Sequence, residues 1–141
     1  MTYNRDTILH LAKLINGNEE SRLWLVQNDF SELVLLHYSI NGYDDALKEL
    51  IKKKYILITA FAHSIRGDAR AFNWLAENKH FEFAATIQVL YKKKNAAQWL
   101  LKNKLEHYLV LASAIRKRLD EDEKGDIFSF FSNLLKRRKK T

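Results

Sequence analysis

The sequence contains no cysteine and no proline, and only four of its 141 residues are glycine. Without cysteine the chain can form no disulfides and no thiolate metal sites. Proline breaks helix interiors, and average usage of about 5% would supply about seven of them. Its absence therefore favours a chain that is nearly all helix. Four glycines are also too few for a glycine-rich loop that would cradle phosphate.

Long apolar runs are absent as well. No run approaches the roughly 18 residues that a membrane-spanning helix needs. Residues 1–16 lack the long apolar core and the small-residue cleavage site of a secretory signal, so we expect a cytoplasmic protein. The hydrophobic share of 47% is ordinary for a globular protein, and 141 residues fit a single domain.

The residues that are present repeat every 25 positions. Four blocks, residues 17–41, 42–66, 67–91 and 92–116, align without an insertion. The ninth position is always leucine, as Leu25, Leu50, Leu75 and Leu100. The eighth position is Trp24, Glu49, Trp74 and Trp99, and the twelfth is Asn28, Lys53, Asn78 and Asn103. A fixed period of this size marks an array of structural repeats.

Each block predicts two short helices. The first is amphipathic and ends at the asparagine of position twelve, because asparagine tolerates the left-handed conformation that closes helices. The second, from about position fourteen to position twenty-five, is apolar nearly all round and is therefore expected in an inner layer. Glycine after this helix supplies the next left-handed cap in three blocks. Lys92 lacks that freedom, so we expect the junction between Tyr91 and Lys92 to differ in geometry.

The two ends of the chain continue the pattern differently. Residues 5–16 match the second helix of a missing block, so the array opens with a half repeat. After Arg116 the pattern fails, and Gly125 followed by Asp126 predicts one helix end and a new helix start. The last helix, residues 127–136, carries a stripe of phenylalanine and leucine and leads into a basic tail. We favour a cap that covers the last repeat, and the alternative is an interfacial membrane anchor.

The pattern A-x-x-W-L-x-x-N, found from Ala71 to Asn78 and from Ala96 to Asn103, resembles short-period repeats of uncharacterised bacterial proteins. The resemblance covers residues 5–116 and implies no activity. The expected fold is an all-α, right-handed-type α-solenoid of αα-hairpins in one domain. It comprises a half repeat (1–16), four hairpins (17–41, 42–66, 67–91 and 92–116), a cap (117–135) and a basic tail (136–141).

Catalytic and metal-binding patterns are missing from the sequence. It contains no P-loop, no dinucleotide-binding glycine motif, no HExxH and no GxSxG. Glu77 and His80 have the spacing found on di-iron helices, but such sites need a second copy on a facing helix. The five histidines fall in five different columns of the repeat. We therefore predict no catalytic residue, no metal site and no cofactor, and a protein that is not an enzyme.

The recurrent tryptophans allow two interpretations. Trp24, Trp74 and Trp99 could stack bases or a ligand along one ridge. They also recur next to the repeated leucine, at a position where a large ring would fill the seam between two helix layers. We favour the packing interpretation.

Lysines mark the turns between the two helices of a block. The residues concerned are Lys52, Lys53, Lys54, Lys79, Lys102 and Lys104. Equivalent turns in stacked hairpins lie about 10 Å apart, so these lysines are expected to form a ridge along one edge. Asp29 takes this place in the first block, so the ridge should fade there. Lysines in turns also simply keep a protein soluble.

The net charge of +7 is concentrated toward the C-terminal end. Residues 92–116 contain six Lys or Arg and one Asp or Glu. The leading functional hypothesis is a non-catalytic scaffold that binds another protein, with acidic proteins among the candidates, because repeat surfaces work by contact. The alternative is an anionic-surface binder, for nucleic acid or acidic membrane headgroups, that uses the six lysines and the basic tail.

Overall fold

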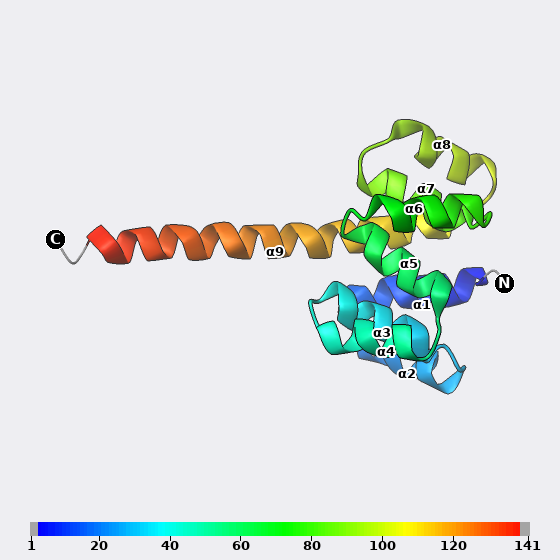
Figure 1. The fold of residues 1–141 in the computed structure, drawn as a ribbon, viewed down its shortest axis with the longest axis horizontal. Helices are drawn as coiled ribbons and strands as arrows, with labels where there is room; N and C mark the ends of the chain where they lie inside the picture. The colour runs from blue at the N-terminus through cyan, green and yellow to red at the C-terminus, as the bar shows by residue number, and fades with distance from the viewer. Residues whose placement is uncertain (1–2, 139–141) are drawn as a thin grey trace.

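The computed structural model describes the backbone of residues 3–138 and the side chains of residues 3–122. Every regular element in this range is an α-helix, which confirms the all-α prediction (Figure 1). The helices are α1 (Arg5–Ile15), α2 (Glu19–Gln27), α3 (Ser31–Ile40), α4 (Asp44–Lys52), α5 (Ile56–Ile65), α6 (Ala69–Glu77), α7 (Phe81–Leu90), α8 (Lys94–Lys102) and α9 (Glu106–Arg138).

The helix starts follow the 25-residue period. Helices α2, α4, α6 and α8 begin at Glu19, Asp44, Ala69 and Lys94, and α3, α5, α7 and α9 begin at Ser31, Ile56, Phe81 and Glu106. The four repeated leucines are 0% exposed. The predicted burial of these four leucines is therefore confirmed.

The left-handed residue that closes each even-numbered helix lies one position later than predicted. Asn28, Asn78 and Asn103 have φ between −100° and −93°. The residues that follow them carry the positive φ, as does Lys54 after α4. Each asparagine instead donates its side-chain amide to the carbonyl of the tryptophan four residues earlier, at 2.7–2.9 Å. The second block has Glu49 and Lys53 where the other blocks have tryptophan and asparagine. There an ion pair between Lys53 and Glu49 at 3.5 Å takes the place of the hydrogen bond from asparagine.

The glycine turns behave as predicted. Gly17, Gly42 and Gly67 have φ of 92° to 99°. Lys92 occupies the same place with φ 63° and keeps the same turn, in which the amide of Lys93 donates to the carbonyl of Gln88 at 2.9 Å. The expected change at this junction is thus limited to the dihedral angle, and the chain path is preserved.

The odd-numbered helices form the inner layer. Helices α1, α3, α5, α7 and α9 each contact the next one, and α1 also contacts α9, so the inner helices close into a ring. Three repeat columns from these helices are buried. They are Ile8, Leu33, Ile58, Phe83 and Tyr108; Leu11, Leu36, Phe61, Thr86 and Leu111; and Ile15, Ile40, Ile65, Leu90 and Ile115. An open array would instead leave its first and last helices apart.

The inner helices are linked at their C-terminal ends by side chains one repeat apart. Arg66 donates to the carbonyls of Ser39 and Ile40, at 3.0 and 3.1 Å, and the Tyr91 hydroxyl donates to the Ile65 carbonyl at 3.3 Å. Arg116 donates to the carbonyl of Leu90 in the same way. Helix C-termini carry unpaired carbonyls and partial negative charge. The guanidinium groups of Arg66 and Arg116 therefore stabilise the helix ends to which they donate.

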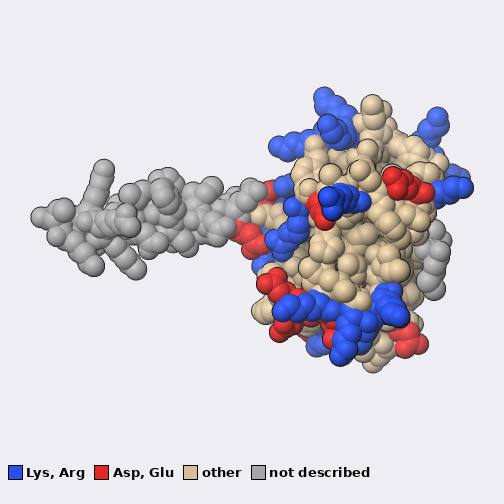
Figure 2. Space-filling model, in the orientation of Figure 1, with Lys and Arg blue, Asp and Glu red and all other residues tan. Residues whose placement is uncertain are grey.

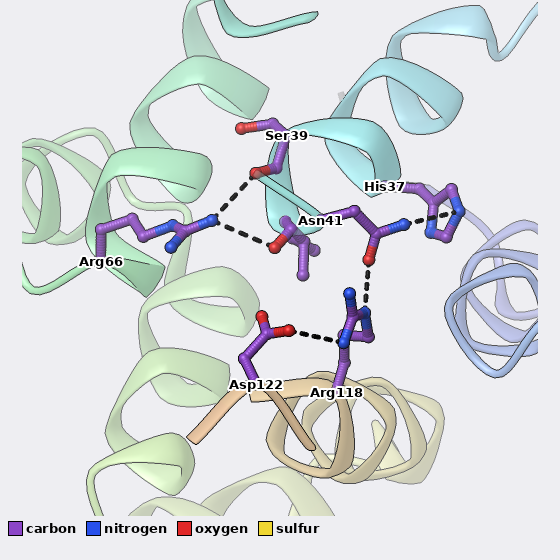
Figure 3. Close-up of polar contacts among 7 residues, drawn as sticks. His37, Ser39, Asn41, Arg66, Arg118 and Asp122 are labelled. Atoms are coloured by element: carbon purple, nitrogen blue, oxygen red, sulfur yellow. Dashed lines mark hydrogen bonds and ion pairs between the residues drawn. The ribbon is translucent and has the colours of Figure 1, made fainter. Parts of the chain in front are cut away.

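Another contact ties α9 to α3 (Figure 3). The Arg118 Nε donates to Asn41 Oδ1 at 2.6 Å, and the amide nitrogen of Asn41 lies 3.3 Å from His37 Nε2. Arg118 also forms an ion pair with Asp122 at 2.8 Å. Because Arg118 lies 77 residues from Asn41, this network joins distant parts of the chain.

The predicted helix break at Gly125 and Asp126 is wrong. Helix α9 is continuous from Glu106 to Arg138, and Figure 1 shows its second half extending beyond the other helices. The predicted cap, residues 117–135, is thus part of α9 and not a separate helix. The stripe of phenylalanine and leucine that would form the cap lies outside the described side chains. Within the described residues, no helix has the length and apolar character needed to cross a membrane.

Candidate binding surfaces

The six predicted lysines, here called the lysine ridge, are all exposed. They flank the turns that precede α5, α7 and α9, whereas Asp29 occupies the turn before α3. Among the described ion pairs, only the one between Lys53 and Glu49 involves a ridge lysine. Figure 2 shows Lys and Arg mainly toward the edges of one face, with a smaller group of basic and acidic residues nearer its centre.

Three ridge lysines adopt a backbone conformation that lysine rarely takes. Lys54, Lys79 and Lys104 have φ of 63°, 62° and 58°. Glycine or asparagine is the usual residue there, because a Cβ in the left-handed region costs about 1–2 kcal/mol. The ridge therefore places its charges at positions that oppose local conformational preference.

Two apolar grooves lie between inner and outer helices. The α5–α6 groove has a volume of about 370 Å³, and its walls include Ile56, Ala60 and Trp74. The α7–α8 groove has a volume of about 510 Å³, and its walls include Phe81 and Trp99. Residues that line the second groove lie 25 positions after residues that line the first, so the two grooves are equivalent by the repeat.

One repeat column accounts for the open space. Its members are His10, Leu35, Ala60, Ala85 and Val110. His10 of α1 stacks on Trp24 of α2, with ring centroids 4.0 Å apart, and Leu35 of α3 packs against the core. The alanines of α5 and α7 lack this bulk and leave a hollow beside Trp74 and Trp99.

The packing interpretation of the tryptophans holds for two of the three. Trp24 and Trp74 are partly buried against the core, and Trp74 also stacks on His80 with centroids 5.4 Å apart. Trp99 is 38% exposed, and its neighbour in the groove, Phe81, is 49% exposed. Trp99 is therefore a groove wall, and its assignment to the core is wrong.

A third surface lies at the N-terminal end of the helix ring. Buried side-chain atoms there include Glu32 Oε1, Glu82 Oε1, His107 Nδ1 and the Tyr108 hydroxyl, for which the described residues supply no hydrogen-bond partner. Burial raises the pKa of Glu32, and it also raises the pKa of Tyr3 and of Tyr108. The carboxylate of Glu32 adds to the effect on Tyr3, and that of Glu82 adds to the effect on Tyr108.

Sequence reasoning identified the lysines but missed the grooves and this polar end. The signal for the grooves was present, since alanine replaces histidine and leucine in one column. The signal for the polar end was weaker, because the repeat column there mixes polar, acidic and apolar side chains. Its members are Thr7, Glu32, Leu57, Glu82 and His107. Among the described residues, no three His, Asp or Glu side chains come together to hold a metal ion.

No protein-family model, curated protein or known structure matches this chain. The function must therefore be argued from these three surfaces.

Proposed function

We propose that this protein is a non-catalytic interaction module that binds a helical segment of another protein in the α5–α6 and α7–α8 grooves. The observation that carries the proposal is the pair of equivalent apolar hollows one repeat apart, each with a tryptophan wall and an alanine floor. Exposed aromatic and aliphatic side chains beside such hollows are typical of binding sites.

The repeat sets the spacing of the partner's anchors. Neighbouring packed helices lie about 10 Å apart, so the two grooves are offset by about that distance. A helix rises about 1.5 Å per residue. A bound helix that fills both grooves therefore needs two apolar side chains roughly seven residues apart on one face. Helical segments commonly bind apolar grooves through such anchors.

The charges near the grooves favour an acidic partner. Lys54 and Arg70 line the α5–α6 groove, against one carboxylate, that of Asp68. The exposed run Lys92 to Lys94 immediately precedes Asn95, which lines the α7–α8 groove. Such a rim attracts acidic residues at the ends of the bound segment and penalises basic ones.

Filling the grooves tests this proposal. The double variant Ala60→Leu and Ala85→Leu places at both positions the residue that the chain already carries at Leu35, so the fold should tolerate it. A displayed library of random helical peptides would be selected on the wild type and then on the variant. We expect enriched peptides with apolar residues at i and i+7 and acidic flanks, which bind the variant at least tenfold more weakly. Equal binding to both proteins, or no enrichment, would contradict the proposal.

We propose as a second function that the lysine ridge binds an anionic surface. The support is the left-handed conformation of Lys54, Lys79 and Lys104, a place where uncharged glycine or asparagine would be more stable. Changing Lys52, Lys54, Lys102 and Lys104 to Glu should abolish retention on heparin. The matched control changes four exposed lysines elsewhere, Lys13, Lys48, Lys93 and Lys117. If both variants lose retention equally, net charge alone is responsible and the ridge has no special role.

For the architecture we propose that the hairpins follow one another with the right-handed winding expected of an α-solenoid, curved until α9 meets α1. The 25-residue spacing of the helices and the contact of each inner helix with the next support this arrangement. An experimental structure in which successive hairpins wind with the opposite hand would overturn it.

A further inference from the structure

A small cavity opens at the N-terminal end of the helix ring, on the side of α3 and α5. This mouth cavity has a volume of about 280 Å³. It is lined by Tyr3, Glu32, Lys54, Tyr55, Ile56, Leu57, Ile58 and His80.

One wall of the mouth cavity is a carboxylate with one buried oxygen that has no hydrogen-bond partner. Glu32 is only 8% exposed, and its buried Oε1 receives no hydrogen bond from the described residues. The described ion pairs include none between Glu32 and Lys54. A buried carboxylate is costly unless a donor or a cation satisfies it. The rings of Tyr3 and Tyr55 in the same cavity are also surfaces that an organic cation favours.

Groups that attract an anion lie at the start of α5. The first amides of a helix have no acceptor within the helix and attract anions. The first turn of α5 contains no acidic residue, and Tyr55 provides no side-chain cap. Residues Ile56, Leu57 and Ile58 of this turn line the mouth cavity together with the exposed Lys54. An anionic group would therefore be stabilised at this end, while a cationic group would be stabilised beside Glu32.

We propose that the mouth cavity binds a small zwitterion of the α-amino-acid type with an apolar side chain. The ammonium group donates to Glu32, the carboxylate accepts from the first amides of α5 and from Lys54, and the side chain packs against Leu57 and the tyrosine rings. Leucine carries both charged groups and an apolar side chain, so it represents this class. The mouth cavity shares Lys54, Tyr55 and Ile56 with the α5–α6 groove, but Glu32 lines neither groove, so the proposal does not depend on the function proposed for them.

Three matched probes test the proposal by calorimetry on the full chain. L-Leucine carries both charges, leucinamide lacks the carboxylate, and 4-methylpentanoate lacks the ammonium. We expect saturable binding of L-leucine, and binding at least tenfold weaker for each of the other two. Equal affinity for leucine and 4-methylpentanoate would show that Glu32 does not bind the ammonium group, which would contradict the proposal. If no free amino acid in a panel of the common twenty binds, the proposal is wrong.

Two variants locate the binding. Glu32→Gln should reduce the affinity for L-leucine at least tenfold and should not unfold the protein, because it removes a buried charge. Glu82→Gln is the matched control, since Glu82 shares the repeat column and has an unpartnered Oε1 but does not line the mouth cavity. Leucine binding that survives Glu32→Gln, or is lost equally in both variants, would overturn the proposal. The groove variant Ala85→Leu should bind leucine normally, which keeps this test distinct from the peptide experiment.

Discussion

At the scale of single residues, a few repeat columns decide whether a position packs or stays open. The column of Leu25 is fully buried in every block, whereas the column of His10 is large in α1 and α3, alanine in α5 and α7, and Val110 in α9. Period and residue type together were enough to predict the first column. The second needed the three-dimensional arrangement, because alanine in an inner helix is just as compatible with tight packing.

The leucine column should contribute equally in each hairpin. Replacing Leu75, which is 0% exposed, by Ala should reduce the free energy of unfolding by about 2–5 kcal/mol, since it removes buried methyl groups and leaves a cavity. Leu23→Ala is the control, because Leu23 is 51% exposed, and its effect should stay within about 0.5 kcal/mol. Urea unfolding measures both, and similar losses for the two variants would contradict the register.

Replacing a lysine of positive φ by glycine should instead raise the free energy of unfolding. Lys79→Gly should raise the free energy of unfolding by about 1 kcal/mol, because glycine adopts positive φ without the steric cost that lysine bears. Lys52→Gly, at the end of α4, should lower it by up to about 1 kcal/mol. The same urea measurement distinguishes them, and a loss of stability in Lys79→Gly would show that the turn is not strained.

At the scale of elements, helix starts and periods were predictable, and the path of the chain after Arg116 was not. A glycine costs a helix interior about 1 kcal/mol, which is less than the support that its surroundings can provide. Upstream, Arg116 pairs with Asp120 at 3.6 Å and Arg118 pairs with Asp122 at 2.8 Å, both between successive turns of α9. Such pairs each add about 0.2–0.5 kcal/mol to a helix, so the two together offset part of the cost of Gly125. The sequence rule for a helix stop omitted this contribution.

The ring contacts of α9 lie before its extended half. Helix α1 packs along α9, and the buried α9 residues of the described range run from His107 to Ile115. A chain that ends at Asp122 should therefore stay folded and monomeric, with a midpoint of thermal unfolding close to that of the full chain. Light scattering and circular dichroism check this. Aggregation of the shortened chain would support the original idea of a C-terminal cap.

The link between α3 and α9 should depend on pH through His37. Burial, followed by the positive charge of Arg118, lowers the pKa of His37 below its ordinary value of about 6.5. The folded state then binds fewer protons than the unfolded state, so stability is retained above pH 6.5 and is lost as the pH falls toward the lowered pKa. Protonation also places an N–H of His37 against the Asn41 amide that donates to it.

An NMR titration of the His37 ring measures this directly. We expect a pKa below 6.5 in the wild type and a rise toward 6.5 in Arg118→Ala, which removes the nearby positive charge. Arg70→Ala, in α6, should leave the His37 pKa unchanged. A wild-type value at or above 6.5 would show that His37 is neither desolvated nor affected by Arg118.

At the scale of the whole molecule, closure of the inner helices is the feature that sequence reasoning could not supply. A repeat specifies how one hairpin contacts the next, but curvature accumulates from small rotations per repeat that leave no signature in the residues. Residues 1–16 were predicted to be a half repeat, yet nothing in their composition indicated a contact with α9. The closure also changes what α1 does, because it covers a face of α9 that an open array would expose.

The distance between the ends of the array tests this account most directly. The natural chain has no cysteine, so spin labels can be attached at Asn16→Cys in the turn after α1 and Lys117→Cys in α9, two positions that line one cavity. A control pair, Glu20→Cys and Asp45→Cys, is one repeat apart in either arrangement. Closure predicts that pulsed electron paramagnetic resonance gives under about 20 Å for the first pair, two helix spacings. A distance of about 40 Å, the span of four helix spacings in an open array, would contradict the closed ring.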